Sequence, residues 1–287
     1  MHGGTPAKPE LRTRRSAIIF YGTAGLAGVG GIAGLHQAWY KQEQSGKFHV
    51  FNDLHEWRGM DKLGHLTSCW WASQWIYETA GTLGLPEKQR MGSALIMPLL
   101  FMSGVEVMDG FSGGYGFSVP DMVANLSGAA LFYFQQLYWG RQHFLLKASF
   151  HTDPLHRIRP ALLGHSWPET WLKNYNGQTL WLSFPLKPIF QDAGWLPAWM
   201  CVSLGYGAGG MLGARDNAWT SGGLDYSFIE LKRHSRYFLS LDIDLLKLPI
   251  RAKAWRMFAS TFRWLKLPFP AIGYSDIHRW QLYALYW

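Results

Sequence analysis

The sequence predicts a mainly α-helical fold, in which a membrane bundle of about four apolar helices precedes a mixed, partly β carboxy-terminal region. Charged residues make up only 16% of the 287 residues, against about 25% in soluble domains, and aromatic residues also reach 16%. Four apolar segments of roughly spanning length occur before residue 140, and prolines and an alternating pattern follow it. Because Trp and Tyr favour membrane–water interfaces, this composition indicates partial immersion in a membrane.

The first apolar segment covers residues 16–35 and follows a polar, basic tail, residues 1–15. The segment carries no charge and has the roughly 20 residues needed to cross a bilayer. The basic residues before it place the tail in the cytoplasm. Two interpretations stay open, a retained transmembrane anchor, which we favour, and a signal peptide. No cysteine follows closely, so a lipid anchor is not expected.

A helical bundle is predicted for residues 50–140. Its apolar segments run from residue 63 to about 85, from 91 to 108 and from 120 to 140. The Gly-rich stretch at residues 109–116 can only be a turn or loop. Short connections between apolar segments of this length imply that the helices pack against one another.

Residues 141–287 form a basic, Trp-rich region of mixed α/β character. Residues 1–140 hold 10 basic and 10 acidic side chains, whereas residues 141–287 hold 17 basic and 9 acidic ones and account for the net charge of +8. Excess positive charge favours contact with anionic lipid or nucleic acid. No nucleic-acid motif is present, so a membrane-facing surface is the better interpretation.

One strand in this region is clearly predicted, because Tyr237 to Leu245 alternates with period two. One face of the strand carries apolar residues, and the other carries Phe238 together with Ser240, Asp242 and Asp244. Weaker strand candidates are Thr179 to Phe184, Cys201 to Met211 and Ile277 to Trp287. Residues 252–266 contain a predicted amphipathic helix.

Polar residues interrupt three of the apolar segments and form the candidate site. An ionisable group near the centre of a membrane costs about 2.5–3.5 kcal/mol or more, so such groups tend to pair inside a bundle. Together they could shift each other's pKa, ligate a divalent metal or bind a polar lipid headgroup. The identity of any cofactor stays open. The candidates are Asp61, Lys62, His65, Glu106, Asp109, Asp121 and Asn125.

Each candidate also has a structural interpretation. Asp61 could cap a helix while Lys62 reaches the interface, and Ser118 with Asp121 has the spacing of a capping box. His65 alone would more often be a packing residue. Glu106 is the hardest to explain structurally, because it lies late in an apolar run with no helix end to cap.

The order of these motifs resembles a family of uncharacterised bacterial membrane-associated proteins of the YfiM type, predicted periplasmic or outer-membrane lipoproteins. A more distant similarity is to VanZ-like membrane proteins. The chain departs from the YfiM type in its long carboxy-terminal half and in having no early cysteine. The motifs that carry the resemblance are Asp61-Lys62-x-Gly64-His65, Glu106-x-x-Asp109-Gly110-Phe111-Ser112 and Gly116-Phe117-Ser118-x-x-Asp121-x-x-Ala124-Asn125-x-x-Gly128.

The function expected is a membrane protein that binds or processes a polar lipid or a cell-envelope precursor. Glu106 or Asp109 would act as base or metal ligand, His65 would carry a proton and Lys62 would contact a phosphate. Asp61, Asp121 and Asn125 would help to bind the substrate.

The alternative is a non-enzymatic subunit or scaffold of an envelope complex, in which the buried charges only fix helix register. A third hypothesis assigns the carboxy-terminal half to an outer-membrane β structure. Membrane lipid and envelope proteins are the expected partners, and nucleic acid is not. The resemblance implies a bacterial cell envelope, where we favour the inner membrane, or the outer membrane if residues 16–35 are cleaved.

Overall fold

A computed structural model describes residues 9–37, 46–188, 190 and 194–287, and the chain divides into two compact units. The helical unit consists of Met1–Asn52 with Ser68–Phe134, and the sheet unit consists of Asp53–Thr67 with Gln135–Trp287. The first eight residues of the predicted cytoplasmic tail lie outside the described residues.

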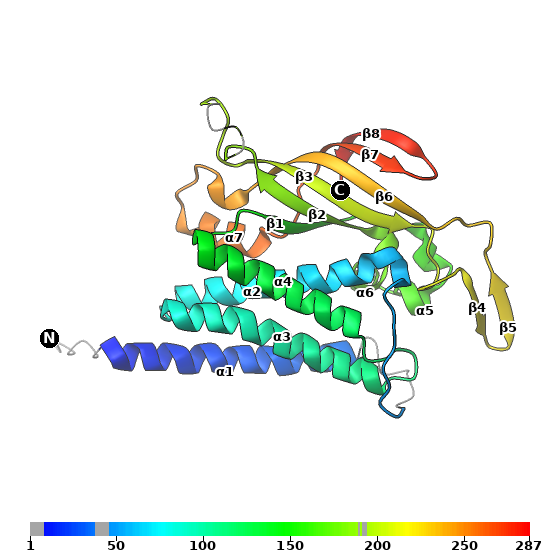
Figure 1. Cartoon of the computed structure of the whole chain (residues 1–287), viewed down its shortest axis with the longest axis horizontal. Helices are drawn as coiled ribbons and strands as arrows, with labels where there is room; N and C mark the ends of the chain where they lie inside the picture. The colour runs from blue at the N-terminus through cyan, green and yellow to red at the C-terminus, as the bar shows by residue number, and fades with distance from the viewer. Residues whose placement is uncertain (1–8, 38–45, 189, 191–193) are drawn as a thin grey trace. The chain divides into compact units, whose positions relative to one another are not determined.

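The long helices are α1 (Pro9–Leu35), α2 (Met60–Thr82), α3 (Glu87–Phe111) and α4 (Val119–Trp139). Within the helical unit α1 and α3 lie side by side (Figure 1), and the hydroxyl of Tyr21 lies 3.0 Å from Oγ of Ser93. The rings of Trp70 and Tyr77 on α2 pack against Phe132 of α4. Aromatic contacts of this kind explain why the predicted helical segments associate.

The predicted fold class, a mainly α bundle of four spanning helices, is wrong. The protein has an α+β fold with a six-stranded antiparallel sheet. Among the described residues only two helical segments, Arg14–Leu35 and Glu87–Phe111, are long and apolar enough to cross a membrane. The other two long helices fail this test because Trp, Tyr, Gln, Ser and Thr lower their hydropathy. A helix that is long enough to cross a bilayer is therefore not always apolar enough to do so.

The sheet unit contains one sheet with the strand order β1-β2-β3-β6-β7-β8, in which every neighbouring pair is antiparallel (Figure 1). A separate hairpin joins β4 to β5. The strands are β1 (Leu145–Phe150), β2 (Gln178–Pro185), β3 (Met200–Gly209), β4 (Ala218–Ser221), β5 (Leu224–Ser227), β6 (His234–Ile243), β7 (Phe269–Ser275) and β8 (Arg279–Tyr286).

The predicted strands are present as β2, β3, β6 and β8. The sequence patterns do not predict β1 and β7. Lys147 interrupts the apolar run of β1, and Pro270 with Gly273 weakens the strand signal of β7. Pairing with established neighbours in the sheet overrides both weak local signals.

Short helices complete the sheet unit. They are α5 (Pro160–Leu163), α6 (Trp167–Lys173) and α7 (Lys253–Phe262). The side chain of Ser166 accepts from the amide of Glu169, and the Glu169 carboxylate accepts from the amide of His165 at 3.0 Å, so both side chains satisfy amides at the start of α6. The predicted amphipathic helix is present as α7 and ends at Phe262, four residues earlier than expected.

One face of the sheet is covered, and its centre holds both aromatic and charged groups. Trp181, Phe238 and Tyr286 form an aromatic cluster there. Nζ of Lys147 lies 2.8 Å from Oδ2 of Asp242, and both side chains are fully buried. Burying two charges costs desolvation energy, and the attraction between Lys147 and Asp242 has to offset this cost inside the sheet.

Candidate functional site

A strained turn precedes α2 in the sheet unit. Trp57 and Arg58 have φ values of 49° and 53°, and Gly59 follows with φ 79°. The amide of Trp57 donates to the carbonyl of Ala214 at 2.7 Å, and the hydroxyl of Tyr206 donates to the carbonyl of Arg58 at 2.6 Å. Non-glycine residues in this region cost about 1–3 kcal/mol each and tend to mark functional sites.

Directly after this turn, the first turn of α2 carries a compact charge cluster. Nζ of Lys62 lies 2.8 Å from Oδ2 of Asp53 and 2.7 Å from Oδ2 of Asp61. The hydroxyl of Tyr175 donates to Oδ1 of Asp61 at 2.8 Å, and Nε2 of His65 lies 3.9 Å from the same oxygen. Asp61 and His65 are four residues apart and share one face of α2. Two carboxylates therefore compensate the Lys62 charge.

In the helical unit, the side chains of two predicted carboxylates, Glu106 of α3 and Asp121 of α4, meet at the start of α4. Glu106 is 1% exposed, and its Oε2 accepts from the amide of Ser118 at 3.2 Å. The amide of Asp121 in turn donates to Oγ of Ser118 at 3.0 Å. The sequence argument that Glu106 has no helix end to cap is wrong, because Glu106 caps α4 from another helix.

The remaining candidates of the helical unit lie nearby in sequence. Asn125 is buried one helical turn after Asp121, and its Oδ1 lies 3.6 Å from Sγ of Cys69. Asp109 is half-buried in the last turn of α3, where its carbonyl accepts from the amide of Ser112 at 3.0 Å. The structure thus brings Glu106 and Asp121 together around Ser118.

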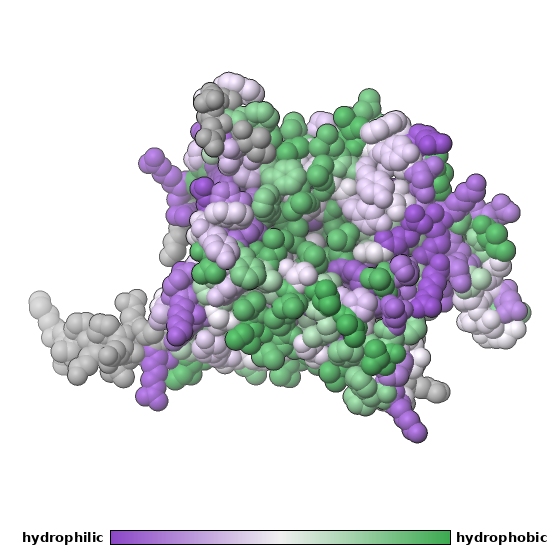
Figure 2. Space-filling view, viewed as in Figure 1, coloured by the Kyte–Doolittle hydropathy of each residue, from purple (hydrophilic) through white to green (hydrophobic). Residues whose placement is uncertain are grey.

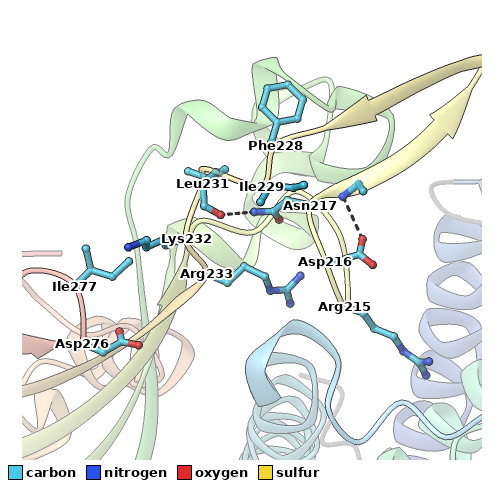
Figure 3. A pocket seen from close by; sticks show the side chains of 11 residues that line it. Arg215, Asp216, Asn217, Phe228, Ile229, Leu231, Lys232, Arg233, Asp276 and Ile277 are labelled. Carbon is cyan, nitrogen blue, oxygen red and sulfur yellow. Dashed lines mark hydrogen bonds between the residues drawn. The ribbon is translucent and has the colours of Figure 1, made fainter.

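A cavity of about 720 Å³ that no sequence motif predicts lies at one end of the sheet unit (Figure 3). It lies where the segments before β4, before β6 and between β7 and β8 meet. Its charged side chains are three basic and two acidic ones. The sequence signal that points toward it is the excess of basic residues after position 140. The lining residues are Arg215, Asp216, Asn217, Ala218, Phe228, Ile229, Leu231, Lys232, Arg233, Asp276 and Ile277.

Arg233 and Asn217 anchor the wall of this cavity. Nη1 and Nη2 of Arg233 donate to the carbonyls of Gly213 and Ala214 at 2.7 and 2.6 Å. Nδ2 of Asn217 donates to the carbonyl of Leu231 at 2.8 Å, which joins two of the lining segments (Figure 3). These bonds hold the basic loops in fixed positions without using the side chain of Lys232.

The electrostatics of the cavity favour an anion. Burial, and next the repulsion from Arg58, lower the pKa of Arg233. Burial also lowers the pKa of His234, and the charge of Arg236 adds to this effect. Burial is the main cause of both shifts, and a bound anion would offset the desolvation and the repulsion between these cations.

The motif segment and the cavity are parts of one site in the sheet unit. Oε1 of Glu56 lies 3.1 Å from Nε of Arg215, and Oδ2 of Asp276 lies 4.0 Å from Nη2 of Arg58. Burial raises the pKa of Glu56, which Arg215 opposes. The strained turn therefore links the charge cluster at the start of α2 to two residues that line the cavity.

The comparison with known families supports a cell-envelope setting for this protein. Residues 50–137 match the model of a family described as a predicted periplasmic lipoprotein (DUF2279). The matched segment covers less than a third of the chain and contains all of the predicted site residues. It supports the YfiM-type resemblance. It supports neither the VanZ-like similarity nor the preference for the inner membrane. No curated protein and no solved structure matches the chain.

Proposed function

We propose that the protein binds the anionic, phosphate-bearing headgroup of an envelope lipid or lipid-linked precursor in the cavity at the end of the sheet. The observation that carries this proposal is the lining of the cavity, in which Arg215, Lys232 and Arg233 outnumber Asp216 and Asp276. Its volume of about 720 Å³ lies in the range of small-molecule sites. The family match supports the envelope setting.

The roles of the basic side chains differ. Arg233 is committed to two carbonyls, so it supplies charge and rigidity. Lys232 is exposed, and Arg215 is more than half exposed, so both can reorient toward a phosphate. Charge-assisted hydrogen bonds from such groups contribute about 1.5–3 kcal/mol each. Loss of one contact should therefore weaken binding by about tenfold or more.

The test uses the full chain in mild detergent, titrated with short-chain phosphatidylglycerol and with phosphatidylcholine of the same acyl chains. Calorimetry should show tighter binding of phosphatidylglycerol. Lys232→Gln and Arg215→Gln should each weaken that binding about tenfold, and Lys232→Arg should retain it. Glycerol phosphate without acyl chains separates recognition of a headgroup from recognition of a whole lipid.

Lys88→Gln is the matched control, because Lys88 is an exposed lysine of the helical unit that does not line the cavity. It should bind phosphatidylglycerol like the wild type. Equal affinity for both lipids, or unchanged binding by Lys232→Gln and Arg215→Gln, contradicts the proposal.

The roles predicted for Glu106, Asp109 and His65 as base, metal ligand or proton carrier remain proposals. They rest on the presence of ionisable groups in largely apolar helices. Alanine at Glu106 and at His65 should abolish the cellular phenotype of the protein while the variants still accumulate in the membrane fraction. If both variants disappear from that fraction, the residues are structural.

A non-enzymatic scaffold is the second candidate function, and one specific observation favours it. The motif carboxylates are engaged in fixing helix ends: Glu106 caps α4, and Asp61 holds Lys62 and Tyr175. Under this alternative the protein should co-purify with an envelope protein in mild detergent. Recovery as a monomer with bound lipid counts against it.

A further inference from the structure

The uncovered face of the sheet consists mainly of apolar and aromatic side chains from β2 to β8, and the polar Ser235 lies at its end. The register of the five strands places these side chains in continuous rows across the sheet. Several are strongly exposed, from 43% for Ile272 to 83% for Leu282. The face consists of Leu182, Phe184, Val202, Leu204, Tyr206, Tyr237, Leu239, Leu241, Ile272, Tyr274, Trp280 and Leu282.

The opposite, covered face carries the polar groups. Lys147 and Asp242 form their buried ion pair there, and Oγ of Ser183 donates to Asp242 at 2.6 Å. Nζ of Lys266 donates to the carbonyls of Leu241 and Leu267 at 2.8 and 3.0 Å. In a water-soluble sheet the apolar face is covered and the polar face is wet. Here the covered face holds buried polar and charged groups beside the aromatic cluster, and the exposed face is apolar, as in sheets whose outer face meets lipid.

Aromatic side chains form a row at the end of the face next to the cavity. Tyr206, Tyr237, Tyr274 and Trp280 are consecutive cross-strand partners on β3, β6, β7 and β8. The ring centroids of Tyr206 and Tyr237 are 5.4 Å apart, and those of Tyr274 and Trp280 are 5.0 Å apart. Rings with polar tips concentrate where hydrocarbon gives way to headgroups.

The same end of the sheet is charged. The segments that connect β3 to β6 and β7 to β8 carry Arg215, Lys232 and Arg233, and Arg279 begins β8. The same segments carry the acidic residues Asp216, Asp225, Glu230 and Asp276. Figure 2 shows hydrophobic side chains over β2, β3 and β6, and hydrophilic side chains at the end of the sheet next to the β4–β5 hairpin. A border of charged side chains beside an aromatic row fits the headgroup level of a bilayer.

A second aromatic group borders the opposite end of the face. The ring of Phe184 contacts Phe144, and Phe144 contacts Trp139, with centroid distances of 6.1 Å in both cases. Exposed Met257 and Phe258 of α7 accompany the basic Arg256, as in helices that lie at a membrane surface. From Tyr237 to Ile243 the apolar band is about 20 Å long at about 3.3 Å per residue, shorter than the hydrocarbon core of about 30 Å.

We infer that the uncovered face of the sheet is immersed in the hydrocarbon of a lipid bilayer, with the aromatic row and the basic end at headgroup level. A protein partner fits this face poorly, because protein interfaces are only about 56–65% apolar and have polar rims. None of the described residues that form the uncovered face is charged, and the charged side chains lie at its border, where lipid headgroups would meet them. This inference does not depend on headgroup binding in the cavity.

The test places a polarity-sensitive fluorophore on single cysteines of the full chain in vesicles of phosphatidylethanolamine and phosphatidylglycerol. The two native cysteines are buried, so added cysteines can be labelled selectively. Leu239→Cys and Leu282→Cys report on the face. Leu224→Cys is the matched control, because Leu224 is an exposed leucine of the hairpin, outside the face. Lipids brominated on their acyl chains and aqueous iodide serve as quenchers.

Probes at positions 239 and 282 should be quenched by brominated lipid and shielded from iodide, and the probe at position 224 should behave in the opposite way. As a second measurement, Leu239→Arg should lower the vesicle-bound fraction at least tenfold relative to Leu224→Arg, with unchanged circular dichroism. Iodide quenching at 239 and 282 overturns the inference. Protection from both quenchers with cross-linking between copies also overturns it, because a second copy then covers the face.

Lys232→Gln separates this inference from the proposed function. If headgroup binding fails but acyl-chain quenching persists in this variant, the face is immersed without help from the cavity. If headgroup binding persists and acyl-chain quenching is absent at positions 239 and 282, the face does not enter lipid and the inference is wrong.

Discussion

At the scale of single residues, His151 shows how burial sets a charge state in this protein. Its ring packs near Tyr286, and its Nε2 lies 3.4 Å from Nη1 of Arg236. Burial, followed by the charge of Arg236, lowers the pKa of His151 from 6.5 to about 4. The folded protein therefore holds this imidazole neutral at pH values at which an unfolded chain protonates it.

The free energy of unfolding should depend on pH through this residue. Because the folded pKa lies below the unfolded one, the contribution of neutral His151 is complete above pH 6.5 and is lost as the pH falls from 6.5 to 4. The loss is on the order of 3 kcal/mol. Urea denaturation of the wild type and of His151→Gln across this range measures it. The variant should show the flatter profile, and parallel profiles would refute the assignment.

Glu106 illustrates what a single sequence hides at this scale. Its position late in an apolar helix indicates a functional carboxylate, and nothing local to α3 provides a partner. The partner is the amide of Ser118, twelve residues later, at the start of another helix. A contact between helices depends on their packing, so helix propensity and capping rules within one segment could not predict it.

At the scale of elements, β6 is the best predicted strand, and the orientation of its faces comes only from the structure. Alternation from Tyr237 onward defines two faces, because side chains alternate along a strand. The strand is half-buried as expected, and its buried face carries Ser240 and Asp242 beside Phe238. Hydrophobicity alone predicts that the apolar face of β6 is buried and that its polar face is exposed, because this rule assumes that water surrounds the protein.

The ion pair that links β1 to β6 should be critical for the sheet. Lys147→Met leaves Asp242 buried without its cation, so the variant should lose about 3–5 kcal/mol of the free energy of unfolding. The double variant Lys147→Met with Asp242→Leu removes both charges and should recover most of this loss. Denaturation midpoints of the three proteins measure the effect. A single variant as stable as the wild type would show that the pair contributes little.

At the scale of the whole molecule, the net positive charge comes from the part of the chain that forms the sheet. Residues 141–287 hold 17 basic and 9 acidic side chains, and this excess is evident from composition alone. The structure adds its location, because Lys232, Arg233 and Arg215 gather at one end of the sheet. Exposed charges act over about a Debye length, roughly 8 Å at physiological salt.

Association with bilayers should therefore have two parts that respond differently to salt. Binding to vesicles that contain phosphatidylglycerol should weaken as the salt concentration rises, because ions screen the basic end of the sheet. Residual binding to pure phosphatidylcholine vesicles should be insensitive to salt, because it depends on apolar burial. Flotation assays at increasing salt measure both parts. Equal salt dependence for the two vesicle types would contradict this division.

The sequence by itself determined the apolar helices, four of the strands of the main sheet, the amphipathic helix α7 and the uneven charge, because each of these follows from periodicity or composition within one segment. Only the tertiary structure decided that the fold is α+β, that Glu106 caps α4, and that a basic cavity adjoins the turn before Asp61. The structure also decided which face of the sheet is covered. These features arise from contacts between residues far apart in sequence, and such contacts leave no local pattern.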